Sequence, residues 1–139
     1  MGVPDYLLYE YAVIRFVPRV DREEFVNIGL IMMNKRKKWL KAMVILDEDR
    51  LKALYPNVDM ECLKIQSGVF ELKDVPSADL PVEERYRWLT AVKSACLQVS
   101  ASHPGLLPED NTEKRDKTED SIPNEMEEEF YRLFNSLIL

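Results

Sequence analysis

The sequence has 139 residues, 46% of them hydrophobic, and 25 acidic against 19 basic side chains give it a formal net charge of −6. This length and composition predict one domain, residues 1–139, able to bury a core. The acidic balance disfavours duplex nucleic acid as a partner, because such binding depends on Lys and Arg meeting phosphates. No apolar run approaches the ~20 residues that span a bilayer and the start lacks a signal-peptide pattern, so we expect a cytoplasmic protein without membrane association.

The first third of the chain predicts three antiparallel strands in succession. Tyr6–Pro18 is rich in aromatic and β-branched residues and ends at a proline. Phe25–Met33 and Trp39–Leu46 follow as apolar runs separated by polar turns. Strand alternation in the first run places two sets of side chains on opposite faces. One face carries Tyr9, Tyr11, Val13, Arg15 and Val17, and the other carries Leu8, Glu10, Ala12, Ile14 and Phe16.

The rest of the chain predicts mostly helices. Acids at the start of Glu48–Pro56 favour a helix there, and apolar spacing favours others at Asp59–Lys73 and Val82–Val92. Ser94–Ser100 is predicted as a further strand. The final segment repeats apolar residues at helical spacing, at Met126, Phe130, Leu133 and Leu137.

Together these elements predict an α+β fold, with an antiparallel sheet of four to five strands covered by helices that include the C-terminal one. The stretch from Pro108 to Ser121 has charges of both signs and no side chain suited to a core. We therefore expect residues 108–121 to be a mobile charged loop.

Several kinds of chemistry have no support in the sequence. A single histidine and few scattered glycines give neither a multi-histidine metal site nor a phosphate-binding loop, so we expect no metal and no cofactor. Cys62 and Cys96 lack a paired-cysteine motif and are interpreted as buried thiols. The basic turn at residues 34–41 is interpreted as a solvated hairpin tip rather than an anion patch.

Arg15 and Asn27 are the sharpest candidates, and two interpretations stay open for them. An arginine in mid-strand among apolar neighbours needs a partner, which Asp21, Glu23 or Glu24 across the turn can supply as a structural ion pair. Alternatively, Arg15 and Asn27 form a small anion- or partner-recognition site, with Gly29 allowing a close approach to the backbone.

His103 lies in a segment, "SASHPGLLP", that is predicted to be a polar turn after the last strand. A general base would need a nucleophile or an orienting carboxylate nearby, and neither is near in sequence.

Three segments resemble the bacterial family known as domain of unknown function 3037: "YEYAVIRFVPRVDREEFVNIGLIM", "RYRWLTAVKSACLQVSASHPGL" and "EEFYRLFNSLI". The resemblance falls on polar, glycine and aromatic positions as well as apolar ones: Tyr11, Val13, Arg15, Pro18, Glu24, Phe25, Val26, Asn27, Gly29, Arg87, Trp88, Ser94, Gln98, His103, Gly105 and Leu106. This chain departs from the pattern at Lys93, where arginine is expected, and at residues 99–101, where Ser-Pro is expected.

The resemblance implies no activity, since the family has none established, but it associates members with HipA-like kinase proteins as partners. It also implies a candidate ligand- or partner-binding set: Arg15, Glu24, Asn27, Gly29, Arg87, Trp88, Gln98 and His103.

The leading hypothesis is a small binding module that recognises a protein partner, with a HipA-like kinase as one candidate, or a phosphate-bearing ligand, and does no chemistry itself. The alternative is an enzyme acting on a phosphate-containing or nucleic-acid substrate, with His103 as acid or base and Arg15 and Arg87 holding the anion. This alternative requires His103 to lie within reach of both arginines.

Overall fold

The computed structural model describes residues 6–19, 24–70, 80–91, 97–108 and 121–139. Several predicted features lie wholly or partly outside these ranges: the turn at 20–23 with Asp21 and Glu23, the end of the second helix beyond Phe70, residues 92–96 with Lys93, Ser94 and Cys96, and the charged loop. In chain order the elements are β1 (Tyr6–Arg19), β2 (Glu24–Asn34), β3 (Trp39–Val44), α1 (Glu48–Leu54), α2 (Met60–Ser67), the 3-10 turn η2 (Gly68–Phe70), α3 (Val82–Thr90), β4 (Leu97–Val99), β5 (His103–Pro108) and α4 (Ser121–Leu137).

The described strands form one antiparallel sheet in the order β3-β2-β1-β4, with β5 also paired to β1. β1 pairs with β2 along one edge, while β4 and β5 follow each other along its opposite edge. Ser100 continues the ladder between β4 and β5, because its backbone N–H donates to Val13 O (2.8 Å) and its Oγ accepts from Val13 N (2.9 Å). The α+β fold expected from the sequence is therefore the fold observed.

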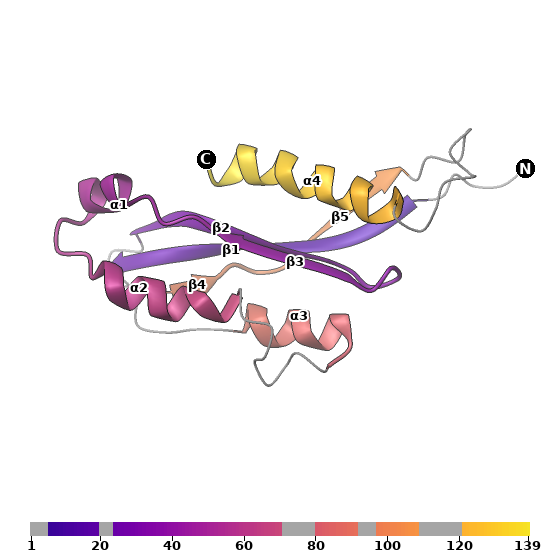
Figure 1. The fold of residues 1–139 in the computed structure, drawn as a ribbon, viewed down its shortest axis with the longest axis horizontal. Helices are drawn as coiled ribbons and strands as arrows, with labels where there is room; N and C mark the ends of the chain where they lie inside the picture. The colour runs from indigo at the N-terminus through magenta and orange to yellow at the C-terminus, as the bar shows by residue number, and fades with distance from the viewer. Residues whose placement is uncertain (1–5, 20–23, 71–79, 92–96, 109–120) are drawn as a thin grey trace, which may run out of the picture.

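Helices cover both faces of the sheet: α4 lies on one side, and α2 and α3 lie on the other (Figure 1). The α4 side buries Tyr9 and Val13 against apolar residues of the helix. The opposite side buries a second core around Ala12, Ile14 and Phe16. The alternation predicted for β1 is confirmed, and each of its faces contributes to a separate apolar core.

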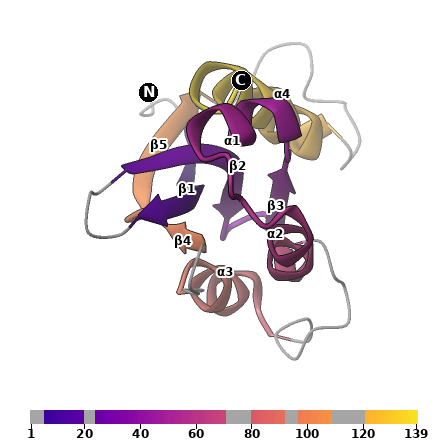
Figure 2. The ribbon, with the colours of Figure 1, turned by 90° about the vertical axis from the view of Figure 1, so that its left-hand side faces the viewer.

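α1 lies at the end of the sheet where α4 finishes (Figure 2). Arg50 of α1 donates from Nη1 to the backbone oxygen of Ile138 at 2.8 Å. α1 and α2 each begin at an aspartate, Asp47 and Asp59, whose carboxylate accepts from a backbone N–H in the first turn. No helix in the described ranges is long and apolar enough to cross a membrane.

One local prediction was wrong. The segment around His103 was expected to be a turn, but His103–Pro108 forms β5 and pairs with Tyr6–Tyr11 of β1. The signal of Pro104, Gly105 and Pro108 for a turn is overridden because β1 offers an open edge there.

Candidate functional site

Three of the predicted site residues form a polar row across the sheet. Arg15 in the middle of β1 is directly opposite Asn27 of β2 on one side and Gln98 of β4 on the other. Directly opposed residues in antiparallel strands project from the same face, and here it is the face covered by α4. We call Asn27, Arg15 and Gln98 the polar row.

The guanidinium of Arg15 lies flat on an aromatic ring. Its Cζ is 4.1 Å from the centroid of the Phe25 ring, and Phe25 is 47% exposed. Within the described residues Arg15 makes no ion pair, and its buried Nε has no hydrogen-bond partner. A guanidinium that stacks on a ring through its face keeps its N–H donors at its edge.

Asn27 has a structural role next to this arginine. Its Nδ2 donates to the backbone oxygen of Leu137 at 3.1 Å, which satisfies a free carbonyl at the end of α4. The Oδ1 of the same amide is buried and has no hydrogen-bond partner in the part of the chain that the structure describes. Asn27 and Arg50 thus hold the carbonyls of Leu137 and Ile138, and they fix the end of α4 on the sheet.

Gly29 is explained by packing. It is opposite Ile14 in β1 and Val44 in β3, just after a break in the β1–β2 register. A Cβ at this position would be 2.6 Å from the backbone oxygen of Met43. Only glycine lets β3 approach this closely, so the packing of the sheet accounts for Gly29.

The remaining predicted site residues do not join the polar row. Glu24 begins β2, opposite Arg19. Arg87 and Trp88 are exposed on α3, on the side of the sheet away from α4 (Figure 1). His103 is exposed at the start of β5, and its ring lies 5.3 Å from that of Tyr11.

The enzymatic alternative required His103, Arg15 and Arg87 to converge. His103 is opposite Tyr11, and Tyr11 is four residues from Arg15 along β1, which corresponds to about 13 Å at ~3.3 Å per residue. Arg87 lies across the sheet from both. General acid or base catalysis needs hydrogen-bond contact or one bridging water, and this arrangement does not provide it.

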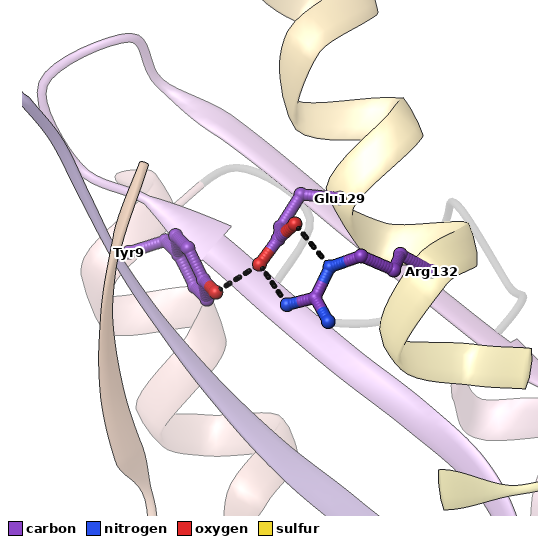
Figure 3. A network of polar contacts seen from close by, with 3 residues as sticks. All are labelled: Tyr9, Glu129 and Arg132. Atoms are coloured by element: carbon purple, nitrogen blue, oxygen red, sulfur yellow. Dashed lines mark hydrogen bonds and ion pairs between the residues drawn. The ribbon is translucent and has the colours of Figure 1, made fainter. Parts of the chain in front are cut away.

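A second polar cluster on the α4 face joins Tyr9, Glu129 and Arg132 (Figure 3). Tyr9 donates from its hydroxyl to Glu129 Oε2 at 2.5 Å. Arg132 donates from Nε to Glu129 Oε1 at 2.8 Å and from Nη2 to Oε2 at 2.6 Å. Tyr9 is 5% exposed and Glu129 is 8% exposed, so this cluster ties α4 to β1 inside the interface.

These contacts shift the ionisation of the cluster. The hydrogen bond from Arg132 holds the pKa of Glu129 below its usual value, although burial alone would raise it. Burial raises the pKa of Tyr9, and the neighbouring carboxylate raises it further. Glu129 therefore stays charged and Tyr9 stays protonated at neutral pH, so that the hydroxyl acts as a donor.

Sequence patterns did not identify Tyr9 and Glu129 as members of a polar cluster. Glu129 is one of several glutamates at the start of the final helix, and this pattern is typical of a solvated first turn. The spacing of the helix nevertheless indicates that Glu129 faces the sheet. Glu129 is three residues after Met126 and four before Leu133, and both of these belong to the apolar stripe. Tyr9 also explains Gly105, because a Cβ at Gly105 would overlap the Tyr9 ring.

Within the described residues, no group of three or more His, Cys, Asp or Glu side chains is placed to hold a metal ion.

The fold and the polar row define a small α+β domain built on one antiparallel sheet, with an arginine stacked on an exposed ring and without an ion pair to any of the described residues. The model of the family described as "Protein of unknown function (DUF3037)" matches residues 11–137, so the chain belongs to this family. No curated protein and no solved structure matches the chain.

Proposed function

We propose that this chain is a binding module that recognises an acidic group of a protein partner through Arg15 stacked on Phe25. The observation that carries this proposal is the guanidinium of Arg15, which lies 4.1 Å from the Phe25 ring centroid without an ion pair to any described residue. A planar guanidinium presents parallel donors that match the two oxygens of a carboxylate or phosphate.

The ring beneath the arginine supports recognition of a protein surface. Phe25 is 47% exposed, so an apolar ring and a cation lie together at the same place. Aromatic residues and arginine are enriched where protein interfaces gain most of their affinity. The net charge of −6 disfavours the binding of an extended polyanion, but it does not prevent a single local contact by an arginine.

The family resemblance names a first partner to test, a HipA-like kinase protein. A phosphate-bearing small ligand is the competing occupant, because the same donors suit it.

The test is capture of the tagged protein from its native cytosol, as wild type, Arg15→Ala and Arg87→Ala. Arg87 is the matched control, because it is an exposed arginine on the opposite side of the sheet. Circular dichroism first establishes that each variant is folded.

A stoichiometric protein that is recovered with the wild type and with Arg87→Ala, but lost with Arg15→Ala, supports the proposal. Recovery of a nucleotide or another phosphate compound in the same pattern would replace the protein partner by that ligand. Equal recovery from all three proteins would overturn the assignment of Arg15.

A further inference from the structure

A concave site lies on the side of the sheet away from α4, between the end of β1 and the start of α2. It is a pocket of about 190 Å³. β1 contributes Phe16, Val17 and Pro18, and the other wall comes from the α1–α2 connection and the first turns of α2, namely Tyr55, Asn57, Val58, Asp59, Cys62 and Leu63.

The pocket has an apolar floor and a polar rim. Phe16 and Leu63, which are 3% and 1% exposed, belong to the core and form this floor. Asn57 and Asp59 are exposed at the rim, and Cys62 is half-buried beside them. An apolar interior with a few polar groups at the mouth is the usual arrangement of a small-molecule site.

The size of the pocket limits its occupant. Protein interiors are packed to crystal-like density and leave few voids larger than a water molecule. An apolar cavity of about 150 Å³ accepts benzene, whereas drug-sized ligands need about 300 Å³ or more. The pocket therefore suits a molecule with one or two fused rings.

The rim limits the charge of the occupant. The carboxylate of Asp59 accepts from the backbone N–H of Cys62 at 3.0 Å, so it is held at the mouth of the pocket. A fixed carboxylate repels an anion and accepts a hydrogen bond from an N–H or O–H donor. The apolar walls disfavour a cation, because burying a charge away from water is costly. A neutral ring with one N–H or O–H donor meets both conditions.

We propose that this pocket binds a small neutral aromatic molecule of the indole class, with its ring against Phe16 and Leu63 and its donor toward Asp59. The site is independent of Arg15, which lies on the α4 side of the sheet, so it stands or fails separately from the proposed function.

The alkylation rate of Cys62, which lies at the rim, measures how much of the pocket is occupied. In a Cys96→Ser background Cys62 is the remaining cysteine, since the chain has two. The measurement is the rate of Cys62 alkylation by iodoacetamide with increasing indole, and with benzoate as an anion of similar size. At ten times its Kd, indole should slow alkylation about tenfold, because only the unoccupied fraction reacts. Benzoate should slow it much less.

Val58→Trp, which fills the pocket, should abolish the protection by indole. Ile65→Trp is the control, because Ile65 is 72% exposed on α2 and does not line the pocket. No slowing by indole, or equal slowing in Val58→Trp, would overturn the proposal.

Asp59→Asn provides a second test that does not depend on Val58→Trp folding, because asparagine caps a helix about as well as aspartate. This variant should keep indole protection and gain benzoate protection. If benzoate protects the wild type as well as indole does, the proposed charge selectivity is wrong.

Discussion

Arg15 and Asn27 are direct partners across β1 and β2, yet neither the buried Nε of the arginine nor the buried Oδ1 of the asparagine has a hydrogen-bond partner among the described residues. The Asn27 amide is turned so that its Nδ2 reaches Leu137 O, and the guanidinium of Arg15 lies on Phe25. Two residues that the sequence places in one candidate site therefore make different contacts. Asn27 holds α4 on the sheet, and Arg15 is the residue that we propose contacts a partner.

Asn27→Ala should destabilise the fold. It leaves the carbonyl of Leu137 without the Nδ2 donor, and an unsatisfied buried acceptor costs about 1–3 kcal/mol. Urea unfolding followed by circular dichroism measures the free energy of unfolding. Asn135→Ala on the exposed surface of α4 is the control and should change it by less than about 0.5 kcal/mol. Equal stability of the two variants would contradict the capping role of Asn27.

Gly29→Ala should also destabilise the fold, by about 1–3 kcal/mol, because overpacking forces the neighbouring backbone to move. The added Cβ would meet Met43 O at 2.6 Å and Val44 Cγ2 at 2.9 Å. Gly68→Ala is a matched control, since Gly68 has helical dihedrals and nothing lies within 4 Å of its added Cβ. Thermal melts should show a lower Tm for Gly29→Ala and an unchanged or higher Tm for Gly68→Ala. The reverse order would show that β3 does not constrain Gly29.

The Glu129 cluster predicts how stability depends on pH. The hydrogen bond from Arg132 lowers the pKa of Glu129 in the folded protein below its ordinary value of 4.5. A carboxyl group with a lowered folded pKa contributes stability that is fully present above the unfolded pKa and is lost as the pH falls through the folded pKa. The contribution of Glu129 should therefore be complete at pH 6 and should decrease below about pH 4.5.

Glu129→Gln isolates this contribution. At pH 6 the variant should be less stable than the wild type by about 1–3 kcal/mol, because the buried hydrogen bonds from Tyr9 and Arg132 lose their charged acceptor. The difference in free energy of unfolding between the wild type and the variant should decrease from pH 5 to pH 3, because Glu129 of the wild type takes up a proton as the pH falls. Other carboxylates are present in both proteins, so their contributions cancel. Glu128→Gln, at an exposed position on α4, should show neither effect. A difference that stays constant with pH would contradict the lowered pKa.

Local patterns predicted much of the fold. The alternation in Tyr6–Pro18 predicted both faces of β1, and the helical spacing from Met126 to Leu137 predicted the side of α4 that packs on the sheet. β5 was not predictable in this way. Its strand conformation depends on the free edge of β1 and on the Tyr9 ring that covers Gly105, and both are tertiary features.

The candidate site was predictable only in part. The three-strand meander places Arg15 near Asn27, but the opposition of Arg15 and Gln98 depends on the register of a strand far along the chain. Arg87 and Trp88 lie elsewhere because composition does not specify which side of a sheet α3 covers. His103 lies apart from Arg15 because β5 pairs with the other half of β1, opposite Tyr11.

The most direct test of the account is the affinity of the captured partner for wild type, Arg15→Lys and Arg15→Ala. Lysine keeps the charge but loses the planar fork and the stacking on Phe25. We predict that both variants bind at least about 30-fold more weakly, the loss typical of an interface hot spot, while both remain folded. Affinities within about twofold of the wild type would contradict it, because the guanidinium would then contribute almost nothing to binding.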